Sequence, residues 1–397
     1  MLQLNWPAWV ARVNSTKGKW ALERWLLMYL HEQQNVDRLA LAIMEHLMAG
    51  GQNIQVRVQS IWVDGTPQAA FSPKGHLPHE ERPQCELADL LVCVRLESSN
   101  GQLQRERAML IQAKVASDYD QLPGGESTKK ERLLFEDCDR QQSITLYPGV
   151  KRENPIGEYQ LDTGSGKQVY GLHDCARFLL MAKERWENVD QAFAPLQVGW
   201  PFFSGKKQIY PPESFLDAVI GMVSGIAPKL GRDIDIGTAT SDCAWTKMVN
   251  DLQGKYLPVT MNGYDRQPRV TTSTDSVKSP YLIFSTMYES QTVNFRTNDQ
   301  WREWCLLSVP FLRHRSVFSR LKERFKFLFF RKSRWGMEEE LEYLRTSGYE
   351  SRAGLKLWND HPNNPPPADS EMNDGNGPHI PILVVTIRGL ETDRRSD

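Results

Sequence analysis

Two apolar, β-favouring segments joined by a tight turn constrain the fold of this chain more than any other feature. The segments span residues 86–94 and 108–115, and Asn100-Gly101 lies between them. Asn-Gly between two such segments is the strongest short-range signal for a β-hairpin, because both residues tolerate positive φ. The sequence therefore predicts two adjacent antiparallel strands.

Hydrophilic side chains interrupt both predicted strands at the same end of the hairpin. Glu86 and Asp89 lie near the start of the first strand, and Gln112 and Lys114 lie near the end of the second. Because side chains alternate along a strand, Gln112 and Lys114 point to one face, and the apolar residues between and beside them pack on the other. A carboxylate, an amide oxygen and a lysine on one face can hold a divalent metal beside a phosphate.

The chemistry of magnesium favours a catalytic interpretation of these residues. Mg²⁺ prefers oxygen ligands and usually takes one or two carboxylates, with water and substrate phosphate completing its shell. Asp89 would anchor Mg²⁺ (or Mn²⁺), Gln112 would supply an amide oxygen, and Lys114 would orient the attacking water and offset charge at phosphorus. The ordinary alternative is that Asp89 only begins a strand and Lys114 lies on a solvent-facing side.

The order of these residues resembles the active-site strands of the PD-(D/E)xK nuclease superfamily. Glu86-Leu-Ala-Asp89-Leu-Leu-Val, a hairpin and Leu-Ile-Gln112-Ala-Lys114 are most similar to the Gln-x-Lys variant of Mrr-type restriction enzymes, over residues 35–150. The resemblance implies a restriction-endonuclease-like mixed α/β sheet flanked by helices. It also implies a metal-dependent endonuclease that hydrolyses phosphodiester bonds of DNA in restriction, repair or antiviral defence, with RNA left open as a substrate. Other subunits of a defence system are further expected partners.

The sequence departs from the superfamily pattern at two positions and leaves the remaining acid open. Ala88 stands where a proline is usual, and Gln112 replaces the usual acid, so fewer negative charges surround the metal. The superfamily often adds a glutamate from the helix before the sheet, for which Glu45 is the best positional match. Glu86 competes, because an irregular start of the strand would bring it to the metal with Asp89. We prefer Glu86 to Glu45, and the predicted metal ligands are Asp89, Gln112 and Glu86.

Patterning along the chain divides it into four parts. Residues 1–150 form the predicted nuclease domain, with helices at 18–34, 36–49 and 128–146 and a strand at 54–63. Residues 151–360 form an α+β domain for substrate or partner recognition, with strands at 176–181 and 281–288 and helices at 213–224 and 242–257. Residues 361–379 are a Pro/Asn/Gly-rich linker. Residues 380–397 contain a segment too apolar to remain exposed to solvent. We expect this segment to dock as a strand, followed by a short tail.

Residues 313–334 combine many basic side chains with interleaved phenylalanines. In such a segment the basic side chains can bind phosphates and the phenylalanines can stack on bases, or the whole segment can lie against an anionic membrane. An amphipathic helix with a solvated basic face is an equally good interpretation. The candidate nucleic-acid-binding residues in this segment are Arg320, Lys322, Arg324, Lys326, Arg331 and Lys332.

Composition limits the partners and the setting. A formal net charge of −1 means that any polyanion would be held by a local patch rather than by overall charge. The six cysteines include no Cys-x-x-Cys pair, which favours reduced thiols in the cytoplasm. Neither a signal segment nor an apolar run of about 18 residues is present, so no membrane span is expected. A catalytically inert nucleic-acid-binding or adaptor subunit of a defence complex is the alternative function.

Overall fold

The computed structural model of this chain describes its residues in twelve segments. They are 6–16, 22–48, 54–63, 67–161, 168–186, 195–201, 205–224, 230–236, 243–254, 269–272, 277–278 and 380–390. The predicted basic segment at 313–334, the predicted strand at 281–288 and the predicted linker at 361–379 lie outside the described residues.

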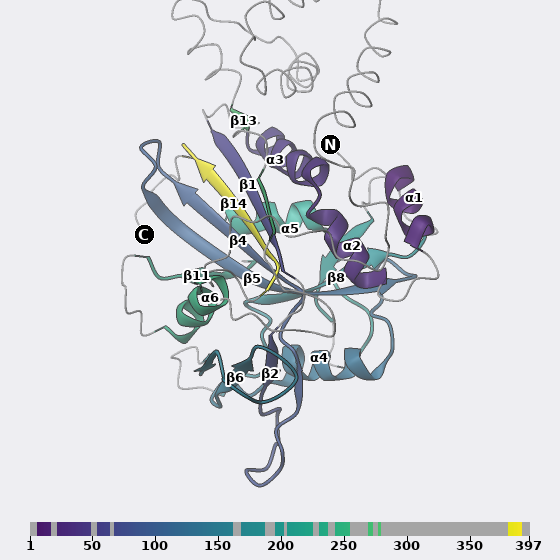
Figure 1. Cartoon of the computed structure of the whole chain (residues 1–397), viewed down its shortest axis with the longest axis vertical. Helices are drawn as coiled ribbons and strands as arrows, with labels where there is room; N and C mark the ends of the chain where they lie inside the picture. Colours follow the sequence, from purple (N-terminus) through teal and green to yellow (C-terminus); the bar gives the residue numbers. More distant parts are fainter. Residues whose placement is uncertain are drawn as a thin grey trace, which may run out of the picture.

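A mixed sheet flanked by helices forms the centre of the molecule (Figure 1). Its strands follow the order β10-β9-β8-β5-β4-β14-β1-β12, with β11 also paired to β5 and β13 to β1. The mixed α/β class predicted from the sequence is therefore confirmed. The strands of this sheet are β1 Gln55–Trp62, β4 Leu90–Glu97, β5 Leu103–Ala116, β8 Ala176–Ala182, β9 Leu196–Gly199, β10 Glu213–Ser214, β11 Arg232–Ile234, β12 Arg269–Thr272, β13 Val277–Lys278 and β14 Ile382–Arg388.

Strand β14 joins the far end of the chain to the middle of the sheet. It pairs parallel with β4 and antiparallel with β1, so that Val385 lies opposite Val94 on one side and Val58 on the other. Figure 1 shows this strand in yellow between its two neighbours. The docking strand expected after residue 380 is therefore present, and its apolar residues are buried because the strand is internal to the sheet.

The sheet continues across the domain boundary that the sequence predicts at residue 150. Strand β5 pairs parallel with β8 over seven positions from Leu110↔Ala176 to Ala116↔Ala182, and β8 pairs in turn with β9. The predicted boundary therefore falls within one sheet and not between two. Parallel pairing of strands far apart in sequence leaves no local signal that a sequence pattern could reveal.

The helix predicted over 128–146 is shorter than expected. Helix α4 spans Glu126–Asp137, so it begins two residues before the predicted start, with Gly125 as its N-cap. Residues Ile144–Tyr147 form strand β6, because their β-branched and apolar side chains are buried in a second, smaller sheet. That sheet has the order β3-β2-β6-β7, with β2 Gln68–Ala70, β3 Gln84–Glu86 and β7 Gly157–Tyr159.

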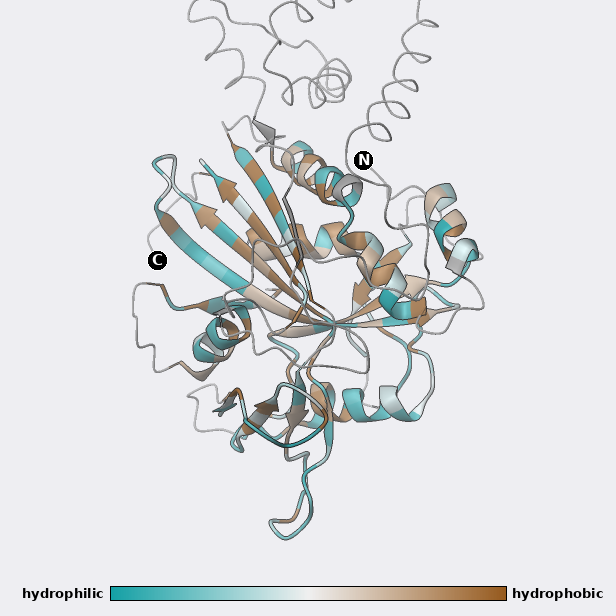
Figure 2. Ribbon diagram, viewed as in Figure 1, coloured by the Kyte–Doolittle hydropathy of each residue, from teal (hydrophilic) through white to brown (hydrophobic). Residues whose placement is uncertain are grey.

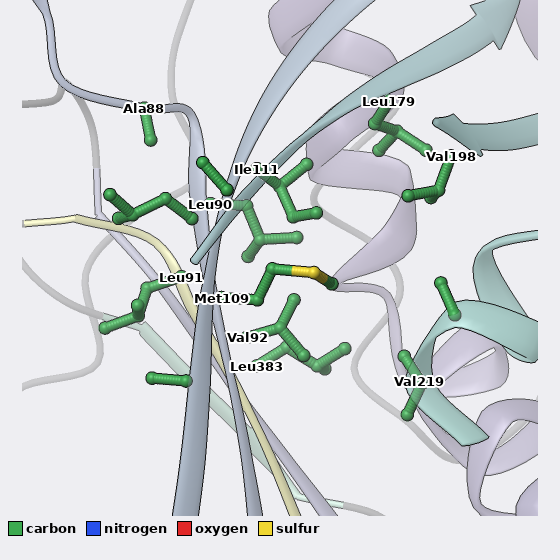
Figure 3. Close-up of a cluster of buried hydrophobic side chains, with 14 of the residues drawn as sticks. Ala88, Leu90, Leu91, Val92, Met109, Ile111, Leu179, Val198, Val219 and Leu383 are labelled. Carbon is green, nitrogen blue, oxygen red and sulfur yellow. The ribbon is translucent and has the colours of Figure 1, made fainter. Parts of the chain in front are cut away.

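Helices cover both faces of the central sheet. Val92 of β4 lies in an apolar cluster with Val219 of α5 (Figure 3), whereas the next residue, Cys93, accepts a hydrogen bond from Gln253 of α6. Since successive side chains point to opposite faces, α5 and α6 lie on opposite sides of the sheet. Helices α2 and α3 lie on the α5 side in Figure 1. Phe135 of α4 packs on Phe178, whose neighbour Leu179 belongs to the α5-side cluster, so α4 lies on the other side of the sheet. The helices described here are α1 Trp6–Thr16, α2 Leu22–Leu30, α3 Gln33–Met48, α5 Phe215–Ser224 and α6 Ala244–Gly254.

The main hydrophobic core lies between the sheet and the helices α2, α3 and α5. Met109 and Ile111 of β5 meet Leu383 of β14 and Leu179 of β8 there (Figure 3). Figure 2 shows the middle of the sheet as hydrophobic and the outer ends of its strands as more hydrophilic. Among the residues that the structure describes, no helix is long and apolar enough to cross a membrane.

Candidate functional site

The predicted hairpin is present, and it sets the register of the site. Strands β4 and β5 are antiparallel neighbours, and Gly101 in their turn has a φ of 84°, a conformation that glycine adopts readily. Leu90 lies opposite Ile111, and the backbone N–H of Asp89 donates to the carbonyl of Ile111 at 2.9 Å. This register brings Asp89, at the start of β4, beside Gln112.

Asp89 is a buried carboxylate held by its neighbours on β5. The side-chain amide of Gln112 donates a hydrogen bond to Asp89 Oδ2, and the backbone N–H of Ala113 donates to the same oxygen at 2.8 Å. Burial raises the pKa of Asp89 well above its ordinary value, and the charges of Glu23 and Glu86 raise it further, whereas Lys114 opposes them. The carboxylate is therefore fixed in position and surrounded by further acids.

Lys114 lies between two carboxylates that come from different helices. Its Nζ is 3.1 Å from Glu23 Oε1 of α2 and 2.9 Å from Glu131 Oε2 of α4. Burial lowers the pKa of Lys114, but the charges of Glu23, Asp89 and Glu131 outweigh burial and raise it above its ordinary value. The ammonium therefore stays protonated at physiological pH, and its position is set from two sides.

A glutamate from a helix before the sheet does lie at the site, but it comes from α2 and not from the helix that carries Glu45. Glu23 lies in α2 and forms an ion pair with Lys114, and its side chain is 33% exposed. Burial raises the pKa of Glu23, and Lys114 lowers it. Glu45 lies half-buried on α3 and is not among the charges that most shift the pKa of Asp89 or Lys114. The sequence did place Glu23 within a predicted helix, but nothing local shows that α2 packs on β5.

Glu86 lies near Asp89 and Glu23 and comes from a third element, β3. It ends β3, its side chain is exposed, and its charge raises the pKa of both Asp89 and Glu23. The carboxylates of Glu23, Asp89 and Glu131 lie around the ammonium of Lys114, and that of Glu86 lies near Asp89 and Glu23. We refer to these five residues with Gln112 as the Asp89 cluster. Its exposed side, formed by Glu23 and Glu86, is where solvent reaches it.

The donor atoms of the cluster are of the kinds that divalent metals take. The side-chain oxygen of Gln112 is buried and accepts no hydrogen bond from any residue that the structure describes, although it lies beside the Asp89 carboxylate. Carboxylate and amide oxygens are the ligands that Mg²⁺ and Mn²⁺ take. Within the described part of the chain, no group of three or more His, Cys, Asp or Glu side chains has metal-site spacing. A metal here would therefore depend on the Gln112 oxygen.

The six basic residues predicted to bind nucleic acid, from Arg320 to Lys332, lie outside the described residues, so their position relative to the Asp89 cluster is not given.

Comparison with protein-family models, curated proteins and solved structures finds no match. The arrangement of side chains in the Asp89 cluster is thus the basis for assigning a function.

Proposed function

We propose that this protein is a metal-dependent endonuclease that hydrolyses phosphodiester bonds at the Asp89 cluster. The observation that carries the proposal is the buried Gln112 oxygen, which has no hydrogen-bond donor among the described residues and lies beside a fixed Asp89 and a charged Lys114. An orphaned buried acceptor costs free energy, so its retention next to a carboxylate supports a role in binding a cation.

Asp89 and Gln112 would hold Mg²⁺ or Mn²⁺, with Glu23 or Glu86 as the further acid. When bound, such a metal polarises a phosphoryl oxygen and lowers the pKa of water. The protein's own residues contribute positioning and charge. The Ala113 N–H orients the Asp89 carboxylate, burial restricts bulk water around it, and the Lys114 ammonium offsets negative charge that develops at phosphorus.

The substrate and setting belong to the same proposal. DNA is the favoured substrate because of the resemblance to restriction enzymes, and defence against foreign DNA is the favoured role. The basic residues Arg320, Lys322, Arg324, Lys326, Arg331 and Lys332 would contact its phosphates. A cytoplasmic setting is consistent with the described cysteines, which are free thiols.

Cleavage of defined nucleic acids tests the proposal. Purified protein is incubated with plasmid, linear duplex, single-stranded DNA and RNA in Mg²⁺, in Mn²⁺ and in EDTA. We expect metal-dependent cleavage that Asp89→Ala and Lys114→Ala abolish while both variants remain folded by circular dichroism. Cleavage by either variant at the wild-type rate would refute the assignment.

A catalytically inert nucleic-acid-binding or adaptor subunit is the second candidate. The observation that favours it is that Lys114 already has two carboxylate partners and that Gln112 is neutral where a third acid would strengthen metal binding. Such a module would bind nucleic acid or a partner subunit without taking up a metal at Asp89.

A further inference from the structure

Glu131 is a buried carboxylate beside the candidate site that the proposed chemistry does not use. It lies in α4 and is 2% exposed. Its Oε1 accepts a hydrogen bond from the Ser127 hydroxyl at 2.6 Å, and its Oε2 lies 2.9 Å from Lys114 Nζ. Oε1 is therefore held by a hydrogen bond and Oε2 by an ion pair, and the partner in that ion pair is the lysine expected to act on the substrate.

The two acids that flank Lys114 differ in their access to solvent. The Glu23 side chain is 33% exposed, whereas that of Glu131 is 2% exposed. A cation that arrives from solvent therefore meets Glu23 first. A buried carboxylate is costly for the fold unless it is paired, and an apolar residue of similar volume often serves a core equally well. The carboxylate at position 131 thus indicates a specific need for charge next to Lys114.

We propose that Glu131 is the positioning residue for Lys114: it keeps the ammonium in place while Glu23 exchanges its contact with the lysine for one with a metal ion. The catalytic consequence rests on the proposed nuclease function, whereas the holding of Lys114 does not. Without Glu131, the remaining partners of Lys114 would be the same acids that the metal recruits. The lysine would then lose its fixed position when it is needed.

The same helix supplies a matched control. Glu136 of α4 is 5% exposed and forms an ion pair with Arg132, and its Oε2 accepts a hydrogen bond from the backbone N–H of Gly205 at 3.0 Å. Glu136→Gln therefore removes a buried, paired carboxylate from α4 without removing a partner of Lys114. A general loosening of α4 would affect both variants, but a specific role for Glu131 would affect only one.

The first test measures Lys114 itself, without metal or substrate. The full-length wild type, Glu131→Gln and Glu136→Gln are treated with an amine-acetylating reagent in EDTA, and mass spectrometry follows acetylation at Lys114. We expect acetylation to be about tenfold faster or more in Glu131→Gln, since loss of the buried ion pair with Glu131 shifts the equilibrium between held and released ammonium by at least that order. Glu136→Gln should match the wild type. Equal rates in all three proteins, or equal increases in both variants, would overturn the inference.

A milder change covers the case in which Glu131→Gln does not fold. Ser127 is exposed, so Ser127→Ala should fold, but it removes the hydrogen bond that orients Glu131. We expect a severalfold increase in Lys114 acetylation in this variant, about the effect of one neutral hydrogen bond. An unchanged rate in folded Ser127→Ala would count against the proposal.

The second test concerns the reaction. If the wild type cleaves DNA, Glu131→Gln should lower kcat by about tenfold or more with little change in KM, because a misplaced lysine weakens transition-state stabilisation more than binding. Glu131→Asp should restore part of kcat. An unchanged kcat in Glu131→Gln overturns the inference. If the wild type cleaves nothing, the proposed function fails, and the acetylation difference then decides the role of Glu131 by itself.

Discussion

Lys114 Nζ and Glu23 Oε1 lie 3.1 Å apart, although 91 positions separate them in the chain. The contact ties α2 to the end of β5, next to the fixed carboxylate of Asp89. It also places an acid from a helix before the sheet at the cluster, as the resemblance to PD-(D/E)xK nucleases implies. That helix is α2, whereas the sequence pattern pointed to Glu45 on the next helix.

The first prediction distinguishes Glu23 from Glu45 as the additional acid. Glu23→Gln should lower metal-dependent cleavage by about 100-fold, because it removes a carboxylate that pairs with Lys114 and would be available to a bound metal. Glu45→Gln should stay within about twofold of the wild type, because Glu45 is not among the charges that most shift the pKa of Asp89 or Lys114. Initial rates of DNA cleavage in Mn²⁺ measure both. Loss of activity in Glu45→Gln with normal activity in Glu23→Gln would reverse the assignment.

The second prediction concerns the neutral ligand. Gln112→Glu adds a buried carboxylate beside Asp89, so the metal-free protein should lose about 1–3 kcal/mol of unfolding free energy. The same change should strengthen Mn²⁺ binding, and Mn²⁺ should therefore raise the Tm of the variant more than that of the wild type. Gln197→Glu, at a buried glutamine of β9, is the matched control and should be destabilised without a gain in response to Mn²⁺. An equal Mn²⁺ response in the two variants would contradict a metal at Gln112.

The third prediction concerns acid stability. His31 is buried, and its imidazole forms a hydrogen bond with the Ser60 hydroxyl. Burial lowers the pKa of His31 to about 3. Because the unfolded chain takes up a proton on this residue below about pH 6.5, His31 stabilises the fold fully above that pH. This stabilisation is lost as pH falls toward the folded pKa, at up to about 1.4 kcal/mol per pH unit.

Urea unfolding at pH 7, 6 and 5 measures this loss. The loss of unfolding free energy between pH 7 and 5 should be smaller in His31→Gln than in the wild type. His46→Gln, at an exposed position of α3, should retain the wild-type slope. An identical slope in His31→Gln would show that this imidazole does not govern acid stability.

The fourth prediction concerns the last strand. A chain that ends at residue 379 lacks β14, which leaves β4 and β1 without their common neighbour in the middle of the sheet. We expect this chain to be insoluble or to lose cooperative thermal unfolding by circular dichroism. A chain that ends at residue 390 should melt like the wild type. Cooperative melting of the shorter chain at the wild-type Tm would exclude a structural role for β14.

Local patterns account for the features that the sequence predicts correctly. The hairpin follows from Asn100-Gly101 between two apolar segments, and the contact of Asp89 with Gln112 follows from antiparallel pairing across that hairpin. The apolar composition of residues 380–387 similarly required burial, which β14 provides. Each of these inferences needs only neighbouring residues or a strand period of two.

The features that the sequence misses depend on long-range packing. The pairing of β5 with β8 joins the two halves that were expected to be separate, and the contacts of Lys114 with Glu23 and Glu131 bring two helices to one strand. None of these contacts leaves a periodic trace in the sequence. The short α4 has a more local cause, since a β-branched segment in β6 follows it and favours a strand.

A calorimetric titration with Mn²⁺ tests the metal site at the Asp89 cluster most directly. The wild type should bind Mn²⁺ at one site, and Asp89→Asn, which preserves the shape of the side chain, should lose that site. Glu45→Gln should bind as the wild type does. Absence of binding in the wild type, or equal binding in Asp89→Asn, would contradict the metal site and favour an inert module.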